Sequence, residues 1–181
     1  PRAWRADPER VHRSLDVLVQ QFPAGAGLAA RAAGDPRSLL RYFSSPEFHA
    51  CMQEGGSLAL AFGDWLVERA GAGSFRDPRV SALAGLERAV VSLRRSASPA
   101  PPATGSGDRY RLSPDKALHH APAGTADLHD AIHRVLGGAE MPLTTAALST
   151  AIPYPADSVR TDAREALLLE LVRDEGPRGK L

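Results

Sequence analysis

Four short pairs, each an acid or a serine followed by a proline, mark places where this chain can start helices. They are Asp7-Pro8, Asp35-Pro36, Ser45-Pro46 and Asp77-Pro78. Proline is well accommodated in the first turn of a helix, and an Asp or Ser side chain just before it can accept hydrogen bonds from the free backbone N–H groups. These pairs therefore predict a series of short helices in the first half of the chain.

The composition also favours a mainly α fold. Hydrophobic residues make up 43% of the 181 residues but aromatic residues only 6%, so alanine and leucine carry most of the apolar content. This balance favours packed helices over sheets, which are enriched in aromatic and β-branched residues. The length fits one domain of ordinary size or two small ones.

Apolar residues recur at helical spacing through the first half. We predict helices over residues 8–21, 36–43, 46–54, 58–70 and 78–95, with a further short helix over 28–33. Together they form a predicted helical domain over residues 1–95. Phe43, Phe48, Phe62 and Trp65 are expected in its core, because aromatic residues at helical spacing usually pack internally.

A change of composition marks a domain boundary. Residues 96–107 contain only Ser, Ala, Pro, Thr and Gly, which is typical of a linker. We therefore predict a second, small domain over residues 108–181. Within it, residues 109–112 and 116–119 flank Ser113-Pro114-Asp115, where proline occupies the second position of a turn. This arrangement predicts a β-hairpin.

Three helices are expected after the hairpin. The first runs from Thr125 or Asp127 to Leu136, the second covers residues 143–152, and the last starts at Asp157 or Thr161 and carries Ala166, Leu167, Leu169, Leu171 and Val172. A hairpin with three helices resembles a small winged-helix-like module. The predicted fold class is therefore mainly α (α+β).

Charge and cysteine content narrow the class of protein. The formal charge of +1 gives no whole-chain attraction to nucleic acid or an anionic membrane. The single cysteine, Cys51, excludes an intrachain disulfide and fits a reducing compartment, and we expect it to be buried as a small apolar residue. No apolar run reaches the about 20 residues of a membrane span. We expect a soluble cytoplasmic protein without membrane contact.

Two histidines form the most suggestive chemical pattern. His129 and His133 are four residues apart on a predicted helix, so their rings can share one face and chelate a divalent metal, with Asp127 or Asp130 nearby. The pattern lacks the glutamate of a His-Glu-x-x-His motif and a third ligand at a fixed spacing. We therefore predict packed or solvated histidines and assign no metal ligand and no cofactor to this chain.

Two acids lie among apolar residues. Asp64 precedes Trp65, and Glu87 follows Leu86 on a predicted helix. They can be read as a catalytic acid/base pair, but such acids more often hold a neighbouring arginine or a helix end in place. We predict structural roles for both, assign no catalytic residue, and do not expect the chain to be an enzyme by itself.

The first half resembles a known family. The resemblance is carried, in order and spacing over roughly residues 8–95, by Gln21-Phe22-Pro23 and by the motifs at residues 43–48, 62–66 and 77–89. It is to the amino-terminal helical domain of the partner proteins of multinuclear non-haem iron oxidative enzymes, of which those of methanobactin biosynthesis are the best known.

The resemblance implies a function without catalysis in this chain. Such partners form a heterodimer with a TIM-barrel enzyme that holds two or three irons, so iron is expected in the partner enzyme. The pair modifies a ribosomally synthesised precursor peptide, often at cysteine. We therefore expect this chain to recognise the leader of such a peptide.

The carboxy-terminal module is the expected peptide reader. An exposed hairpin edge can accept an extended peptide as an added strand, with main-chain hydrogen bonds giving affinity and alternate side chains giving selectivity. Tyr110, Leu112 and Leu118 are the predicted peptide-binding residues.

The helical half is expected to dock on the enzyme. Aromatic residues and arginines are enriched at interface hot spots. Trp4, Phe75 and Arg76 are therefore the predicted interface residues.

Two alternatives stay open. One is a helical DNA-binding regulator, although residues 143–152 carry no basic residue, which is unfavourable for a recognition helix. Nucleic acid is therefore not an expected partner. The weaker alternative is a small metal-dependent hydrolase built on His129 and His133.

Overall fold

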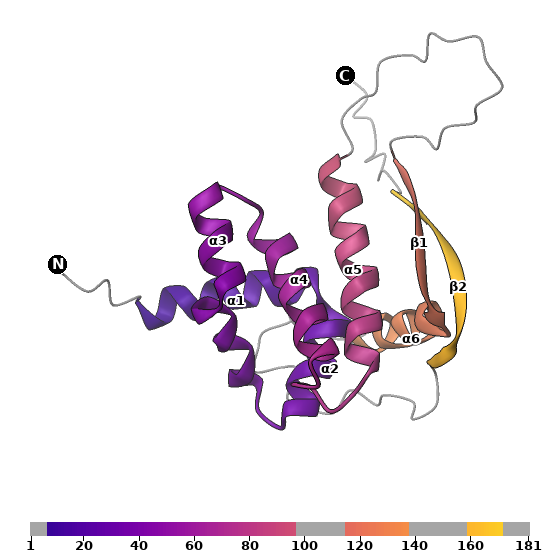
Figure 1. Ribbon diagram of the computed structural model, residues 1–181, viewed down its shortest axis with the longest axis horizontal. Coiled ribbons are helices and arrows are strands. Elements are labelled where there is room, and N and C mark those ends of the chain that lie inside the picture. The colour runs from indigo at the N-terminus through magenta and orange to yellow at the C-terminus, as the bar shows by residue number, and fades with distance from the viewer. Residues whose placement is uncertain (1–6, 97–114, 138–158, 172–181) are drawn as a thin grey trace, which may run out of the picture.

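The computed structural model describes residues 7–96, 115–137 and 159–171 of the chain. Its elements are α1 (Pro8–Gln21), α2 (Pro23–Ala33), the 3₁₀ helix η1 (Pro36–Ser44), α3 (Pro46–Glu54), α4 (Leu58–Gly71), α5 (Arg79–Ser96), β1 (Lys116–Ala123), α6 (Thr125–Gly137) and β2 (Arg160–Glu170). Helices α1–α5 gather into a bundle, and the two-stranded sheet lies beside α5 (Figure 1). The predicted mainly helical fold with a small antiparallel sheet is confirmed.

The Asp-Pro and Ser-Pro pairs start helices as predicted. The side chains of Asp7, Asp35, Ser45 and Asp77 each accept a hydrogen bond from a backbone N–H two or three residues further on. The helix after Asp77 begins at Arg79 instead of Pro78, and the segment after Asp35 is a 3₁₀ helix. Local capping therefore accounts for most of the helix boundaries.

Helix α2 is longer than predicted. It begins at Pro23, and its residues from Pro23 to Ala30 are all buried. Small residues allow this burial, because a Cβ atom at Gly25 would lie 3.0 Å from the Cα atom of Ala84 on α5. The Gly/Ala stretch that resembles a turn in the sequence is therefore a closely packed helix.

The core of the bundle is centred on Tyr42. Its ring lies 5.1–5.8 Å, centroid to centroid, from the rings of Phe43, Phe48, Phe62 and Trp65. The Tyr42 hydroxyl donates a hydrogen bond to a backbone carbonyl oxygen at the start of α4, so burial leaves this polar group satisfied. The predicted core position is confirmed for Phe62 and Trp65, whereas Phe43 and Phe48 are partly buried and pack against this core.

The sheet differs from the prediction in its second strand. Residues 116–119 form a strand as expected, which extends to Ala123, but in the described structure it pairs antiparallel with β2. The predicted pairing segment at residues 109–112 lies outside the described residues, as do residues 143–152 and most of the linker. Helix α6, which was predicted to follow the hairpin, is confirmed and lies between the two strands in the chain.

The predicted last helix is wrong over residues 160–170, because these residues form β2. Along β2 the half-buried and exposed positions alternate: Ala163, Glu165, Leu167 and Leu169 are half-buried, and Arg164, Ala166, Leu168 and Glu170 are exposed. This period of two is that of a strand with one face turned inward. Pairing with β1 therefore outweighs the helical propensity of this alanine- and leucine-rich segment.

The part of the predicted second domain that the structure describes shares a core with the helical bundle. Leu128 and Ile132 of α6 are buried in the same cluster as the residues of α1–α5. Strand β1 also contacts α5. The sheet and α6 are thus held against the bundle, which brings side chains of α5 and α6 together.

Candidate functional site

One face of the sheet carries an exposed leucine pair. Leu118 of β1 lies directly opposite Leu168 of β2, and the two residues are 54% and 58% exposed. Next to them Lys116 Nζ and Glu170 Oε1 form an ion pair at 3.0 Å. This outer sheet face, defined by these four residues, combines an apolar patch with a charged border.

Strand β2 has an open edge in the described structure. Its one strand neighbour there is β1, which lies between α5 and β2 (Figure 1). Half of the backbone N–H and C=O groups of an edge strand point away from its neighbour and can pair with another extended chain. The edge and the outer sheet face together form a candidate peptide-binding surface.

The predicted peptide-binding residues are only partly covered by the structure. Leu118 lies exposed on a strand, as its predicted role requires, whereas Tyr110 and Leu112 lie outside the described residues. Leu168 was missed because its segment was expected to be helical. The alternation along β2 was the available signal, but three consecutive leucines conceal it.

The predicted interface residues fall in different environments. Phe75 is only 6% exposed, and its ring packs edge-on against Trp65 at a centroid distance of 6.1 Å. It therefore belongs to the core of this chain and does not offer its ring to a partner. Arg76 beside it is exposed, and Trp4 lies outside the described residues.

Glu87 holds a helix end, as predicted. Its carboxylate oxygens accept hydrogen bonds from the backbone N–H groups of Ala24 at 2.8 Å and Gly25 at 2.9 Å, in the first turn of α2. The N-cap residue of α2 is Phe22, which has no side-chain acceptor, so Glu87 of α5 supplies one. Burial raises the pKa of Glu87 to about 8, although the two backbone hydrogen bonds act in the opposite direction.

Asp64 holds an arginine, which was the other predicted structural role. Its carboxylate forms an ion pair with the Arg88 guanidinium, with Nη2 and Oδ2 3.2 Å apart. The contact joins α4 to α5. Both acids therefore make the structural contacts that were predicted for them.

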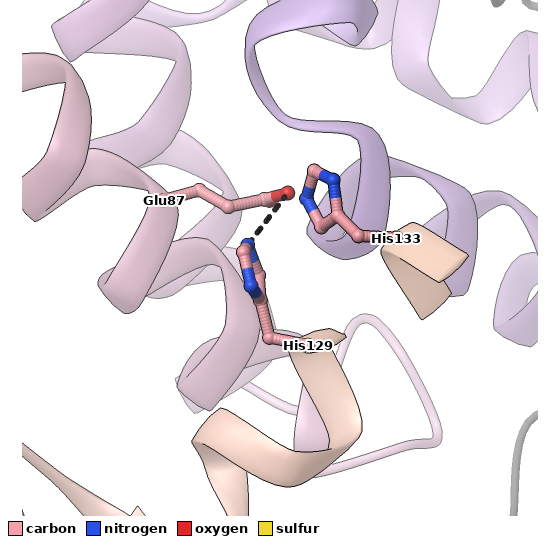
Figure 2. A group of neighbouring side chains, drawn as sticks. All are labelled: Glu87, His129 and His133. Carbon is pink, nitrogen blue, oxygen red and sulfur yellow. Dashed lines mark ion pairs between the residues drawn. The ribbon is translucent and has the colours of Figure 1, made fainter. Parts of the chain in front are cut away.

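The two histidines of α6 meet at Glu87 (Figure 2). The ring centroids of His129 and His133 lie 4.2 Å apart, and His129 Nε2 lies 3.9 Å from Glu87 Oε1. One ligand-type atom from each of the three residues falls within 4.8 Å of the others. The sequence could not identify Glu87 as the third member, because it lies on another helix at no fixed spacing from the histidines.

Burial and mutual proximity keep these histidines neutral. Burial lowers the pKa of His129 to about 4, with the neighbouring His133 adding to this effect and Asp130 opposing it. Burial also lowers the pKa of His133, on which Asp130 and Arg94 act in opposite directions. Both imidazoles therefore have a free nitrogen lone pair at neutral pH.

Cys51 is buried, as predicted. Burial raises the pKa of its thiol, and the negative charge of Glu54 adds to the effect. A thiol with a raised pKa is a poor nucleophile at neutral pH. Cys51 is therefore a packing residue.

Comparison of the chain with protein-family models, with curated proteins and with solved structures gives no match. Of the helices in the described ranges, none has both the length and the apolar character that are needed to cross a bilayer. The described residues offer two candidate sites, namely the sheet edge and the Glu87–His129–His133 cluster.

Proposed function

We propose that this chain is a non-catalytic partner subunit of a cytoplasmic TIM-barrel multinuclear iron oxidative enzyme. In this role it recognises the leader of a ribosomally synthesised precursor peptide. The observation that supports the proposal best is the open edge of β2 beside the exposed Leu118–Leu168 pair. The family resemblance of the helical half supplies the identity of the enzyme and of the peptide class.

The leader binds as a third, extended strand along β2. Backbone hydrogen bonds to the open edge provide sequence-independent affinity, and side chains on alternate positions provide selectivity. A peptide side chain opposite Leu168 would lie about 5 Å from it, whereas Leu118 is one strand further away. We therefore expect an apolar leader residue at the position that meets Leu168.

Charged residues border this contact. Arg164 and Glu170 share the exposed side of β2 with Leu168. A leader with an acid near Arg164 and a base near Glu170 is favoured by cross-strand charge pairing. A third strand also stabilises the sheet, because two strands alone are marginally stable in water.

The helical half docks on the enzyme and leaves chemistry to it. Arg76 is the accessible part of the predicted anchor, and Trp4 remains a predicted contact. Asp64 and Glu87 are engaged in structural contacts and Cys51 is buried with a raised pKa. These observations support a partner whose irons are held by the other protein.

Co-expression with the genes that neighbour its own tests the partnership. We expect affinity purification of this chain to recover a TIM-barrel protein in about equal amount, with iron in the complex. Recovery of the chain alone, with binding to duplex DNA of any sequence that weakens steeply with salt, would favour the DNA-binding regulator. Hydrolytic activity of the isolated chain that depends on His129 would favour the hydrolase.

Peptide recognition is tested separately by fluorescence anisotropy with the labelled leader of the co-encoded precursor. Leu168→Asp places a charge where an apolar contact is expected and should weaken binding more than about tenfold. Val17→Asp is the matched control, because Val17 on α1 is 55% exposed. Equal affinity of both variants and the original chain would exclude strand addition at this face.

A further inference from the structure

Glu87 caps the start of α2 by itself, so the two histidines of the Glu87–His129–His133 cluster are not needed for that role. The histidine rings come from α6 and point toward the carboxylate that α5 contributes (Figure 2). We propose that Glu87, His129 and His133 bind one divalent transition metal ion, with Zn²⁺ as the best fit. This site is independent of the proposed function.

The donor set selects the type of ion. Two imidazole nitrogens and one carboxylate oxygen suit Zn²⁺, whereas Mg²⁺ and Ca²⁺ prefer oxygen ligands throughout. Three protein ligands leave a fourth tetrahedral position open, as in zinc sites that hold a water molecule. His133 lies toward solvent and His129 is partly buried, so the open position lies on the side of His133.

The separations are close to those of a bound state. Bonds of about 2.0–2.1 Å at tetrahedral angles place ligand atoms about 3.3 Å apart. The relevant atoms lie within 4.8 Å of one another, and the Glu87–His129 pair is at 3.9 Å. Metal binding would therefore draw these atoms together by up to about 1.5 Å.

Two of the ligands are already oriented. Each Glu87 oxygen accepts one backbone N–H and keeps a second lone pair for a metal. The other ring nitrogen of His129, Nδ1, lies 3.7 Å from Asp130 Oδ1. A carboxylate on the far side of a ligand histidine is a common outer-shell arrangement that fixes the ring and increases its basicity.

Charged groups of both signs lie next to the site. Asp130 lies beside His129, and Arg94 is a basic group whose charge acts on His133. Bound metal would join α6 to α5 and, through Glu87, to the start of α2.

Isothermal titration calorimetry with Zn²⁺ tests the proposal on the full chain, prepared without a polyhistidine tag and freed of metal by a chelator. We expect one equivalent to bind. His129→Ala and His133→Ala should each weaken binding by more than about tenfold, which is the smallest effect expected even for an outer-shell partner. His120→Ala is the matched control, because His120 is exposed on β1 and outside the cluster.

A second measurement separates ligand loss from unfolding. Co²⁺ in place of Zn²⁺ should give the visible absorption of a tetrahedral ion, and Glu87→Gln, which keeps one acceptor oxygen, should change it. Circular dichroism checks the fold of each variant, and His133→Ala decides the question if Glu87→Gln unfolds, because His133 is exposed. The proposal fails if no stoichiometric ion binds, if both histidine variants bind as tightly as the original chain, or if His120→Ala alone abolishes binding.

Discussion

The helical bundle and the sheet are stabilised in different ways. In the bundle, Tyr42 and Phe62 are fully buried and touch each other and further aromatic rings. In β2 no residue of Arg160–Glu170 is buried, and the inward-facing side chains are only half covered by the described structure. The bundle is therefore stabilised by its own packing, whereas the sheet depends on strand pairing and on contact with α5. Within the described residues, one side of the sheet is left uncovered.

The two regions nevertheless share one structural device. Glu87 of α5 accepts N–H groups at the start of α2, and Glu165 of β2 accepts those of Gly124 at 3.2 Å and Ala126 at 3.0 Å at the start of α6. In both cases a carboxylate from a distant segment does what a local cap does elsewhere. Each contact fixes a helix to another element as well as capping it.

The largest predicted difference between the bundle and the sheet is in how much free energy of unfolding is lost when a side chain is removed. Phe62→Ala removes a ring that contacts three other aromatic rings and should lower the free energy of unfolding by about 3–5 kcal/mol. Chemical denaturation monitored by circular dichroism measures this loss. Val17→Ala, at an exposed position of α1, is the control and should stay within about 0.5 kcal/mol. A small loss for Phe62→Ala would contradict the view that the bundle depends on its aromatic core.

The next effect concerns close helix packing. A Cβ atom at Gly63 would lie 2.7 Å from Phe22 Cε1, so Gly63→Ala should cost about 1–3 kcal/mol by overpacking. Gly85→Ala is the matched control on α5, because a Cβ atom there meets no atom within 4 Å. Alanine has the higher helix propensity, so this second variant should be neutral or up to about 1 kcal/mol more stable. Thermal unfolding measures both effects. A lower midpoint for Gly63→Ala, with an unchanged or higher midpoint for Gly85→Ala, would support the packing described. Equal midpoints for the two variants would contradict it.

Asp77 provides a pH-dependent test at the start of α5. Burial raises its pKa, but hydrogen bonds from the side chain and backbone of Arg79 outweigh this and hold the pKa below the ordinary 3.8. Its charged form therefore contributes stability above pH 3.8 that is lost as the pH falls through the lowered pKa. Asp77→Ala should cost about 1 kcal/mol at neutral pH, and the difference from the original chain should shrink below pH 3.8.

Urea denaturation over a pH series measures this difference. Asp77→Asn is the control, since it keeps an acceptor for the Arg79 N–H but carries no charge. It should recover part of the loss at neutral pH, and because neither variant carries the titrating carboxyl, the difference in stability between Asp77→Asn and Asp77→Ala should stay constant as the pH falls. A difference between Asp77→Ala and the original chain that grows in acid would show that the sign is wrong.

The smallest stability effect is expected on the outer sheet face. Leu168→Thr exchanges an exposed leucine for a residue that also favours strands, so the free energy of unfolding should change by no more than about 0.5 kcal/mol. Differential scanning calorimetry checks this. If the proposed function holds, the same variant still binds the leader less tightly. A large loss of stability would mean that Leu168 is covered by another part of this chain.

The sequence predicted the bundle well for local reasons. Asp7, Asp35, Ser45 and Asp77 act within three residues of their own position, so their effect is readable without knowledge of the fold. The aromatic residues at helical spacing likewise identify one face of a helix. The structural roles of Asp64 and Glu87 were predicted as a type, but their partners were not, because Arg88 and the start of α2 meet them only after folding.

The sheet was harder to predict because its order depends on distant segments. Residues 160–170 contain good helix formers, and only the presence of β1 makes the extended form preferable. Glu165, Leu167 and Leu169 face inward at every second position. This alternation is hidden in the sequence, because Leu168 between them is also apolar but faces outward. The third member of the histidine cluster was missed for the same reason, since Glu87 approaches His129 through the packing of α5 and α6.

The pairing of β1 with β2 also has a consequence for the order of folding. Residue 116 pairs with residue 170, so the sheet forms only after a long loop that contains α6 has closed, whereas α1–α5 follow one another directly in the chain. Non-local pairings of this kind form late, and local helical contacts form early. The bundle can therefore be complete while β1 still lacks its strand partner. Local opening of the native protein should begin at the same place, by release of β2 while the aromatic core stays closed.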